Sequence, residues 1–274
     1  MPKCTFAKIL NIGKMDLRES SHRNSSPAFR HPWELARLEV VSRLVRKYAG
    51  SKPGNILDLG CGDLFFIKEF KKKFPDGSAV AVDIEFSDSL LESEKQTLEI
   101  LGISAFKTLD QAQENFKEKV NLVLLLDVIE HIEDDIGFLK MLESFSFISK
   151  DALVVITVPA YQALFCSHDR FLGHYRRYNN KMLEAHISRA GFQPIKTGYF
   201  FHSLLYPRAL QVTREKFFPP GKETTGLVEW GGGKVKTNLI KNVLVGDFAF
   251  SFSLGTLGIK IPGLSNYILC KRPE

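Results

Sequence analysis

The chain has 274 residues, of which 44% are hydrophobic and 25% charged, as expected of one large soluble domain or a domain with a sizeable elaboration. Its four cysteines lie far apart without metal-like spacing, which excludes a disulfide framework and indicates reduced thiols in a cytoplasmic protein. No window holds about 18 uncharged apolar residues, and the N-terminus lacks an apolar signal core, so neither a transmembrane helix nor a secretory signal is predicted.

The formal net charge of +6 is unevenly distributed along the chain. Residues 1–53 carry 11 basic and 4 acidic residues, residues 54–165 carry 10 and 20, and residues 166–274 carry 16 and 7. The acidic middle indicates a self-contained module, and the basic flanks suit an anionic partner. Solvated surface charge without a partner is the alternative interpretation.

The first 74 residues predict an arm, a helix, and then a strand, a glycine turn and a second helix. Residues 1–30 are polar and predict a mobile arm, and apolar residues then recur at helical spacing up to the glycine- and proline-containing stretch 49–54. The next ten residues, NILDLGCGDL, predict a buried strand and a tight glycine turn, followed by a helix over 65–74. Such a turn lets backbone N–H groups approach a ligand at the sheet edge where α/β proteins bind ligands.

Strands and helices alternate beyond this turn. Further strands are predicted at 78–83, 103–107, 120–126, 152–158, 195–201 and 267–271, and helices at 89–101, after 132 up to 149, and at 181–190. This alternation predicts an α/β fold with a doubly wound, seven-stranded, mostly parallel sheet and helices on both faces. The predicted core spans residues 31–201 and includes the first helix as a lid. Residues 265–274 add the final strand.

Residues 202–264 form a predicted helical insertion before the last strand. Its apolar runs, at 201–212 and 239–252, are mixed with lysine and arginine. They fit either a hydrophobic cover over the side of the predicted site where a substrate would enter, with peripheral contact to a membrane, or an extra helical layer with its own small core.

Two kinds of nucleotide cofactor suit a glycine turn followed by an acid. The dinucleotide fingerprint needs a third glycine where this chain has Phe65, which argues against a nicotinamide or flavin dinucleotide. Asp83 ends the second predicted strand about 20 residues after the glycines, a spacing at which a carboxylate accepts hydrogen bonds from ribose hydroxyls.

The run Asp58-x-Gly60-x-Gly62 resembles motif I of class I S-adenosylmethionine-dependent methyltransferases. The segments ILDLGCG, VAVD and LLLDVIEHI are spaced as in that superfamily, over roughly residues 55–160. HPWELAR and HDRFLGHYRRY resemble a bacterial branch that is linked to glycan or lipid modification. The resemblance implies a seven-stranded sheet whose last strand is antiparallel, S-adenosylmethionine as the cofactor, and methyl transfer as the reaction.

The resemblance also implies which residues bind the cofactor. These are Asp58, Gly60, Cys61 and Gly62 at its methionine and ribose end, Asp83 on the ribose hydroxyls, Ile84 and Asp110 at the adenine, Asp127 beside the sulfonium, and Trp33 and Arg37 as a lid that pairs with the methionine carboxylate.

Methyl transfer from a sulfonium depends mainly on alignment and on the exclusion of water, and an oxygen or nitrogen acceptor also benefits from a base such as histidine. His131, His168 and Asp169 are therefore the candidate catalytic residues. The alternative for His131 is a histidine at a helix start that packs and hydrogen-bonds locally. In the cluster of His168, Asp169 and His174, the carboxylate could orient one histidine and keep it basic. No metal site is predicted, because the pattern His168-Asp169-x4-His174 lacks a further ligand.

Four more residues are candidates for binding the acceptor: Tyr161, His174, Arg176 and Arg177. Guanidinium groups bind phosphate or carboxylate bidentately, so the two arginines favour an anionic acceptor. Surface or core positions are the alternative for the arginines and the tyrosine.

Together these features predict a cytoplasmic S-adenosylmethionine-dependent methyltransferase that acts on a small or lipid- or glycan-linked acceptor, with oxygen favoured. One alternative is a catalytically silent S-adenosylmethionine-binding scaffold, because Leu64 stands where the superfamily often has a third glycine and its side chain could crowd the turn. A nucleic-acid methyltransferase is less favoured, because the chain lacks a base-flipping motif and an aromatic-basic platform.

Overall fold

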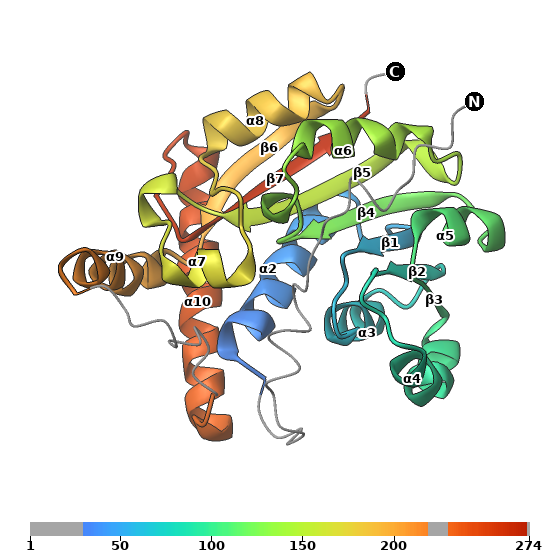
Figure 1. The fold of residues 1–274 in the computed structure, drawn as a ribbon, viewed down its shortest axis with the longest axis horizontal. Helices are drawn as coiled ribbons and strands as arrows, with labels where there is room; N and C mark the ends of the chain where they lie inside the picture. The colour runs from blue at the N-terminus through green and yellow to red at the C-terminus, as the bar shows by residue number, and fades with distance from the viewer. Residues whose placement is uncertain (1–29, 219–229, 273–274) are drawn as a thin grey trace.

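The computed structural model describes residues 30–218 and 230–272. All but the last residue of the predicted arm, 1–30, lies outside the described residues. Seven strands form one sheet in the order β3-β2-β1-β4-β5-β7-β6 (Figure 1). They are β1 (Asn55–Leu59), β2 (Ala79–Val82), β3 (Ile103–Phe106), β4 (Val120–Leu126), β5 (Ile148–Pro159), β6 (Gln193–Phe200) and β7 (Ser265–Lys271).

Strands β1 to β5 pair in parallel, whereas β7 runs antiparallel to both β5 and β6. The described helices of three or more turns are α2 (Pro32–Tyr48), α4 (Asp88–Leu101), α9 (His202–Phe217) and α10 (Gly233–Thr256). Shorter helices are α3 (Phe65–Lys73), α5 (Leu109–Asn115), α6 (Asp135–Met141), α7 (Ser167–Leu172) and α8 (Asn180–Arg189). The predicted doubly wound, seven-stranded, mostly parallel sheet is confirmed.

Two hydrophobic cores cover the two faces of the sheet. Along β4, Leu122 and Leu124 face the core shared with α2, α3 and α10, whereas Val123 and Leu125 face the core shared with α5, α6 and α8. Figure 1 shows α6 and α8 on one side of the sheet and α2 and α10 on the other. A strand segment buried on both faces needs apolar residues on both, which is why residues 122–126 form a continuous apolar run.

One predicted boundary is wrong, because the helix expected to reach Ser149 ends much earlier. α6 stops at Met141, a short 3-10 helix, η3 (Leu142–Ser144), follows, and β5 already begins at Ile148. Ile148 pairs with Val120 of β4, and Phe147 is buried in the core on that face. Phe147 and Ile148, which continue the apolar spacing of the helix, therefore belong to β5 and to the segment just before it.

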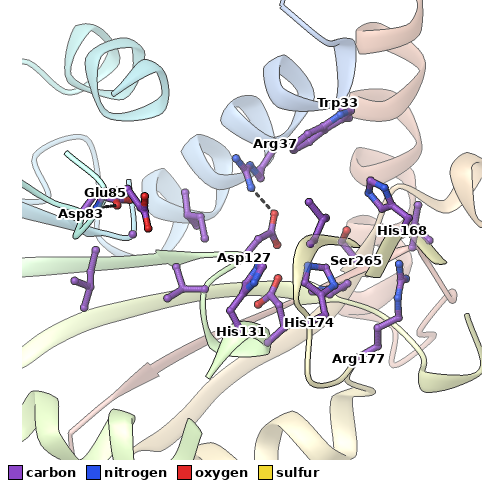
Figure 2. A pocket seen from close by; sticks show the side chains of 18 of the residues that line it. Trp33, Arg37, Asp83, Glu85, Asp127, His131, His168, His174, Arg177 and Ser265 are labelled. Carbon is purple, nitrogen blue, oxygen red and sulfur yellow. Dashed lines mark hydrogen bonds and ion pairs between the residues drawn. The ribbon is translucent and has the colours of Figure 1, made fainter. Parts of the chain in front are cut away.

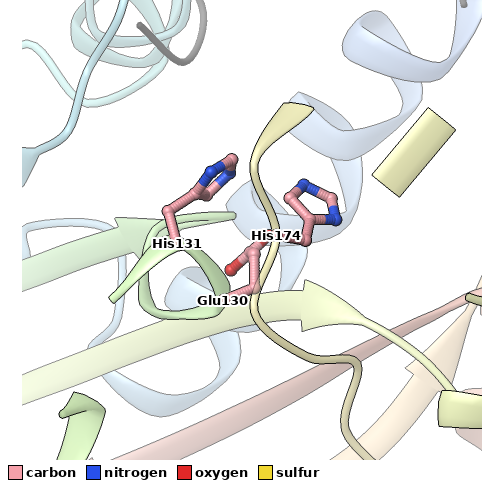
Figure 3. Close-up of side chains that lie close together, drawn as sticks. All are labelled: Glu130, His131 and His174. Carbon is pink, nitrogen blue, oxygen red and sulfur yellow. The ribbon is translucent and has the colours of Figure 1, made fainter. Parts of the chain in front are cut away.

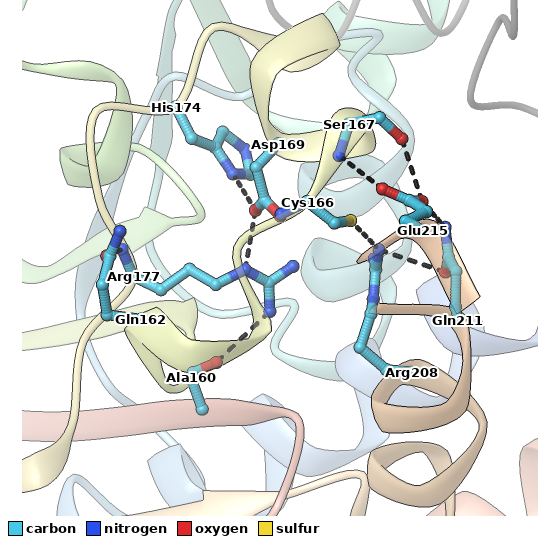
Figure 4. A network of polar contacts seen from close by, with 10 residues as sticks. All are labelled: Ala160, Gln162, Cys166, Ser167, Asp169, His174, Arg177, Arg208, Gln211 and Glu215. Carbon is cyan, nitrogen blue, oxygen red and sulfur yellow. Dashed lines mark hydrogen bonds and ion pairs between the residues drawn. The ribbon is translucent and has the colours of Figure 1, made fainter. Parts of the chain in front are cut away.

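The insertion contributes α9 and α10, and the larger of the two helices packs onto the main fold. Leu244, Val245 and Phe248 of α10 are buried in the same core as α2 and the sheet. α9 lies beside the start of α7, where Glu215 accepts hydrogen bonds from the backbone N and the hydroxyl of Ser167 (3.0 and 2.9 Å; Figure 4). No helix in residues 30–218 or 230–272 is long and apolar enough to cross a membrane.

Candidate active site

A cavity of about 430 Å³ lies at the carboxyl ends of the parallel strands, between the sheet, α2, α7 and α9 (Figure 2). Parallel α/β sheets bind ligands at this edge. Ten residues singled out in the sequence line the cavity: Trp33, Arg37, Gly60, Asp83, Ile84, Asp127, His131, His168, His174 and Arg177. The fold thus gathers residues from five separate segments into one space.

The glycine turn after β1 forms part of the cavity floor. Gly60 has a positive φ of 76°, and its backbone N donates to the Val82 carbonyl at 2.8 Å. A Cβ added at Gly60 would come within 2.7 Å of a methyl group of Val128. Both the backbone conformation and the close approach of Val128 therefore require glycine at this position.

The Asp83 carboxylate is fixed at the end of β2 by backbone groups. One oxygen accepts from the Gly62 N at 2.8 Å and the other from the Glu85 N at 2.9 Å (Figure 2). Burial raises the pKa of Asp83, although these two N–H groups oppose the rise. A carboxylate held this way presents its remaining lone pairs in a fixed direction, which suits a ligand with paired hydroxyls.

Leu64 does not crowd the turn. Its backbone is left-handed, with φ of 66°, and its side chain is fully buried in the core beneath α2 and α3. The residues that line the cavity do not include it. The crowding that motivates the alternative of a silent scaffold is therefore absent.

Leu64→Gly is expected to destabilise the fold and leave cofactor binding unchanged. The left-handed leucine costs roughly 1–2 kcal/mol, which glycine would recover, but loss of a buried leucine costs roughly 2–5 kcal/mol. We expect a net decrease of about 1–3 kcal/mol in the free energy of unfolding. Urea unfolding and calorimetric titration with S-adenosylmethionine check this. A gain of tenfold or more in affinity would show that the leucine obstructs the turn.

Opposite charges meet above the end of β4. Arg37 on α2 forms an ion pair with Asp127, whose second carboxylate oxygen accepts from the Thr157 hydroxyl at 3.1 Å (Figure 2). The Arg37 guanidinium also lies over the Trp33 ring, 5.0 Å from its centroid. The start of α2 is fixed by a capping box that involves the side chain of His31. A neighbouring guanidinium and carboxylate are complementary to the two charged ends of an amino acid.

The far end of the cavity carries three histidines, and a buried carboxylate orients one of them. Asp169 is fully buried and accepts from Cys166 N (2.9 Å) and Arg177 Nε (2.7 Å), and its Oδ1 lies 2.8 Å from Nδ1 of His174 (Figure 4). Burial alone would raise the pKa of Asp169, but the hydrogen bonds and charge of these partners hold it below its usual range. The rings of His131 and His174 meet edge to face with centroids 4.5 Å apart.

Burial also lowers the pKa values of the other two histidines at this end of the cavity. The pKa of His131 is lowered to about 2 by burial and by the neighbouring His174. The pKa of His168 is lowered to about 4 by burial and by the Arg208 guanidinium. Both imidazoles are therefore neutral at pH 7. The sequence groups Asp169 with His168 and His174 without deciding which histidine it orients, and the structure joins Asp169 to His174 and Arg177.

The lowered pKa of His168 predicts a pH dependence of stability. The unfolded chain takes up a proton near pH 6.5, whereas the folded protein resists protonation down to about pH 4, so the unfolded state binds more protons between these values. The contribution of His168 to the free energy of unfolding should therefore fall as the pH is lowered through that window, by roughly 1–2 kcal/mol from pH 7 to pH 5. His168→Gln should show a correspondingly shallower fall in urea unfolding. Parallel curves for the two proteins would contradict this origin.

Several predicted residues lie outside the cavity. Asp58 and Cys61 are buried at the end of β1 and in the turn, and Asp110 is exposed in the first turn of α5. Of these three, none lines the cavity, whereas Thr108 and Leu109 do.

Two of the predicted acceptor-binding residues have protein partners instead. Arg176 donates to two backbone carbonyls after β4, at 3.1 and 2.5 Å, and pairs with Asp135 at 3.1 Å. The Tyr161 ring stacks on Tyr199, with centroids 5.1 Å apart. Neither Arg176 nor Tyr161 lines the cavity. Arg177 does line it, but its guanidinium is bound to Asp169 and to the Ala160 carbonyl (3.2 Å; Figure 4).

The structure adds lining residues that sequence reasoning misses. Glu130 lies between two predicted site residues in the segment LLLDVIEHI, so its place in that motif was the available signal. Glu85 follows Asp83 by two residues, and its backbone N is part of the carboxylate cradle. Arg208 and Gln211 come from α9, in the insertion whose pattern is least informative.

Comparisons with known proteins agree with this architecture. A family model described as a methyltransferase domain matches residues 33–197. A comparison with curated proteins gave no match. Among solved structures, a coclaurine N-methyltransferase bound to N-methylheliamine and SAH is 17% identical, with a TM-score of 0.50 over 85% of this chain and 72% of that one.

Two further structures share the fold. The methyltransferase domain of bacterial CtHen1-C is 15% identical, with a TM-score of 0.50 over 88% of this chain and 98% of that one. A Haemonchus contortus phosphoethanolamine N-methyltransferase 2 is 16% identical, with a TM-score of 0.51 over 86% of this chain and 52% of that one.

The sheet order, the glycine turn and the acid after β2 define a class I methyltransferase fold. The chain belongs to the methyltransferase-domain family. It is an S-adenosylmethionine-dependent methyltransferase, and S-adenosylmethionine is its cofactor.

Proposed function

We propose that this enzyme transfers a methyl group to an oxygen atom of a small acceptor, either free or linked to a glycan or lipid. The observation that carries the proposal is one continuous cavity with two chemically different ends. One end presents the Asp83 carboxylate, and the other presents neutral imidazoles beneath the insertion helix α9. The Arg37–Asp127 pair lies between them.

The residues at the first end fit S-adenosylmethionine. Asp83, held by two backbone N–H groups, would accept hydrogen bonds from the ribose hydroxyls, and Ile84 and Leu109 offer apolar surface to adenine. Arg37 and Asp127 would pair with the carboxylate and ammonium of the methionine portion. When bound, the cofactor supplies a methyl group already activated on a sulfonium.

The second end fits an acceptor that must be aligned rather than strongly activated. Neutral His131 and His168 can accept a hydrogen bond from a hydroxyl and so orient its oxygen toward the methyl group. Their lowered pKa values make them weak acceptors of the proton itself. Phe201, Leu204 and Leu264 line the same cavity and would accommodate an apolar part of the acceptor and exclude water.

The proposal is tested by incubating the enzyme with S-adenosylmethionine carrying a labelled methyl group and a panel of small acceptors. The panel contains matched hydroxyl, carboxyl and amine compounds, free and linked to a lipid or glycan, together with an RNA and a DNA oligonucleotide. Products are located by mass spectrometry. We expect label on oxygen. Label confined to nitrogen, or to nucleic acid, would contradict the proposed acceptor, and bound cofactor without any methylated product would support a silent scaffold.

We also infer that the insertion contacts a membrane surface. Large apolar side chains are exposed on α9 and α10 and just beyond α9: Tyr206, Leu210, Phe217, Phe218, Val235, Leu239, Val243 and Phe250. Single exposed apolar residues are ordinary, but a gathering on two neighbouring helices is typical of an interaction surface. The net positive charge of this part of the chain favours anionic lipids.

Binding to vesicles checks this inference. We expect the enzyme to sediment with vesicles of phosphatidylglycerol and phosphatidylethanolamine, and the double variant Phe217→Ser with Phe218→Ser to lose at least tenfold in affinity. Ile100→Ser, which removes an equally exposed apolar residue from α4, is the control and should bind as the wild type does. Equal binding by all three proteins, or no binding by the wild type, would contradict the membrane contact.

A further inference from the structure

Three side chains with metal-binding atoms meet at the acceptor end of the cavity. Glu130 and His131 belong to the short 3-10 helix η2 (Ile129–His131), which follows β4, and His174 follows α7 (Figure 3). Each offers one ligand atom, and the three atoms lie within 4.8 Å of one another. All three residues line the cavity.

Glu130 provides an independent indication that this cluster receives a ligand. Its side chain is fully buried, and within the described residues neither carboxyl oxygen has a hydrogen-bond partner. A buried carboxyl without a partner costs several kcal/mol, and nearly all buried polar groups in proteins are satisfied. A ligand that reaches both oxygens from the cavity would remove that cost.

The imidazole of His174 is oriented as metal-binding imidazoles usually are. Nδ1 of His174 lies 2.8 Å from the Asp169 carboxylate, which is held ionised by Arg177. This contact places the proton on Nδ1 and leaves Nε2 with its lone pair. A carboxylate behind the imidazole is the usual way in which proteins fix the tautomer and direction of a metal-binding histidine. The ring of His131 meets that of His174 edge to face.

We propose that Glu130, His131 and His174 bind a divalent transition-metal ion. Two imidazole nitrogens and one carboxylate oxygen suit Zn²⁺, Mn²⁺, Fe²⁺ or Co²⁺, whereas Ca²⁺ and Mg²⁺ prefer oxygen ligands alone. Ligands about 2.1 Å from a tetrahedral zinc lie about 3.4 Å apart, so atoms that lie within 4.8 Å of one another need to approach by at most roughly 1.4 Å. The pattern around His174 lacks a further ligand in the sequence, because Glu130 and His131 lie more than 40 residues earlier in the chain.

Three protein ligands leave coordination positions open toward the cavity. This step rests on the proposed function: an acceptor hydroxyl bound there would have its pKa lowered by the metal and would need no strong base. The metal would thus perform the activation, with His131 as its ligand, and His168 would be left to orient the hydroxyl.

Binding of the metal alone tests the proposal without any methyl transfer. The full chain, freed of metal by a chelator, is titrated with Zn²⁺ by calorimetry and with Co²⁺ by visible absorption, in the absence of cofactor and acceptor. We expect one ion per chain and Co²⁺ bands typical of nitrogen and oxygen ligands. Glu130→Gln keeps the shape of the side chain and removes the charged ligand, so it should weaken both metals at least tenfold.

His202→Gln is the matched control. The ring nitrogens of His202 already contact the Pro262 carbonyl (2.9 Å) and the Ser251 hydroxyl (2.6 Å), outside the cavity. This variant should bind both metals as the wild type does. The proposal is overturned if the wild type binds no stoichiometric ion, or if Glu130→Gln binds as tightly as His202→Gln. Failure of metal binding alongside chelator-resistant methyl transfer would reject the metal and leave the proposed function standing.

Discussion

Asp83→Ala is expected to weaken S-adenosylmethionine binding by at least roughly 100-fold, because two hydrogen bonds to a charged acceptor are lost, each worth about 1.5–3 kcal/mol. The Asp83 carboxylate is held between the backbone N–H groups of Gly62 and Glu85, so it is already positioned for a ligand. Asp83→Asn keeps the size of the side chain and should also lose most of the affinity. Calorimetric titration measures both variants.

The control for this experiment is Asp151→Ala. Asp151 is exposed near the amino end of β5, whereas the cavity lies at the carboxyl ends of the strands. Its removal should change the dissociation constant by less than twofold. If both Asp83 variants bound S-adenosylmethionine within threefold of the wild-type affinity, the proposal that Asp83 binds the ribose hydroxyls would be contradicted.

Asp169→Ala is expected to lower the free energy of unfolding by roughly 3–5 kcal/mol, because it leaves the buried Arg177 guanidinium without its counter-charge. Arg177 is 3% exposed, and its Nε lies 2.7 Å from the Asp169 carboxylate. Adding Arg177→Met to this variant removes the stranded charge and should recover much of the loss. Urea unfolding of the single and double variants measures the difference.

An exposed ion pair gives the comparison. Glu69 pairs with Lys72 on the surface of α3, and Glu69→Ala should cost less than about 1 kcal/mol. If Asp169→Ala were no more destabilising than Glu69→Ala, the buried pair would not organise the histidine end of the cavity.

The fold was largely predictable, because its signals are local. The β4 segment is apolar at nearly every position since both of its faces are covered, and the alternation of such segments with helical patterns determines a parallel sheet. The end of α6 was not predictable from pattern alone. Phe145, Phe147 and Ile148 continue a helical spacing, and only their burial against the sheet shows that the chain has already left the helix.

The candidate site divides in the same way. Gly60, Asp83 and Asp127 follow strand ends, so the sheet brings them to one edge as the sequence predicts. The acceptor end depends on contacts between distant segments. The histidine that Asp169 contacts is His174, a choice that the sequence leaves open, and Arg208 reaches the cavity from α9. Residue spacing in the sequence predicts neither the contact of Asp169 nor the position of Arg208, because each depends on how the segments after β5 fold over the sheet.

The most direct test of the account is a crystal structure of the enzyme with S-adenosylhomocysteine. We predict both ribose hydroxyls within hydrogen-bond distance of the Asp83 carboxylate and the amino-acid end between Arg37 and Asp127, with its sulfur facing the imidazoles. A nucleoside bound elsewhere, or with its sugar turned away from β2, would contradict the assignment of this cavity as the methyl-transfer site.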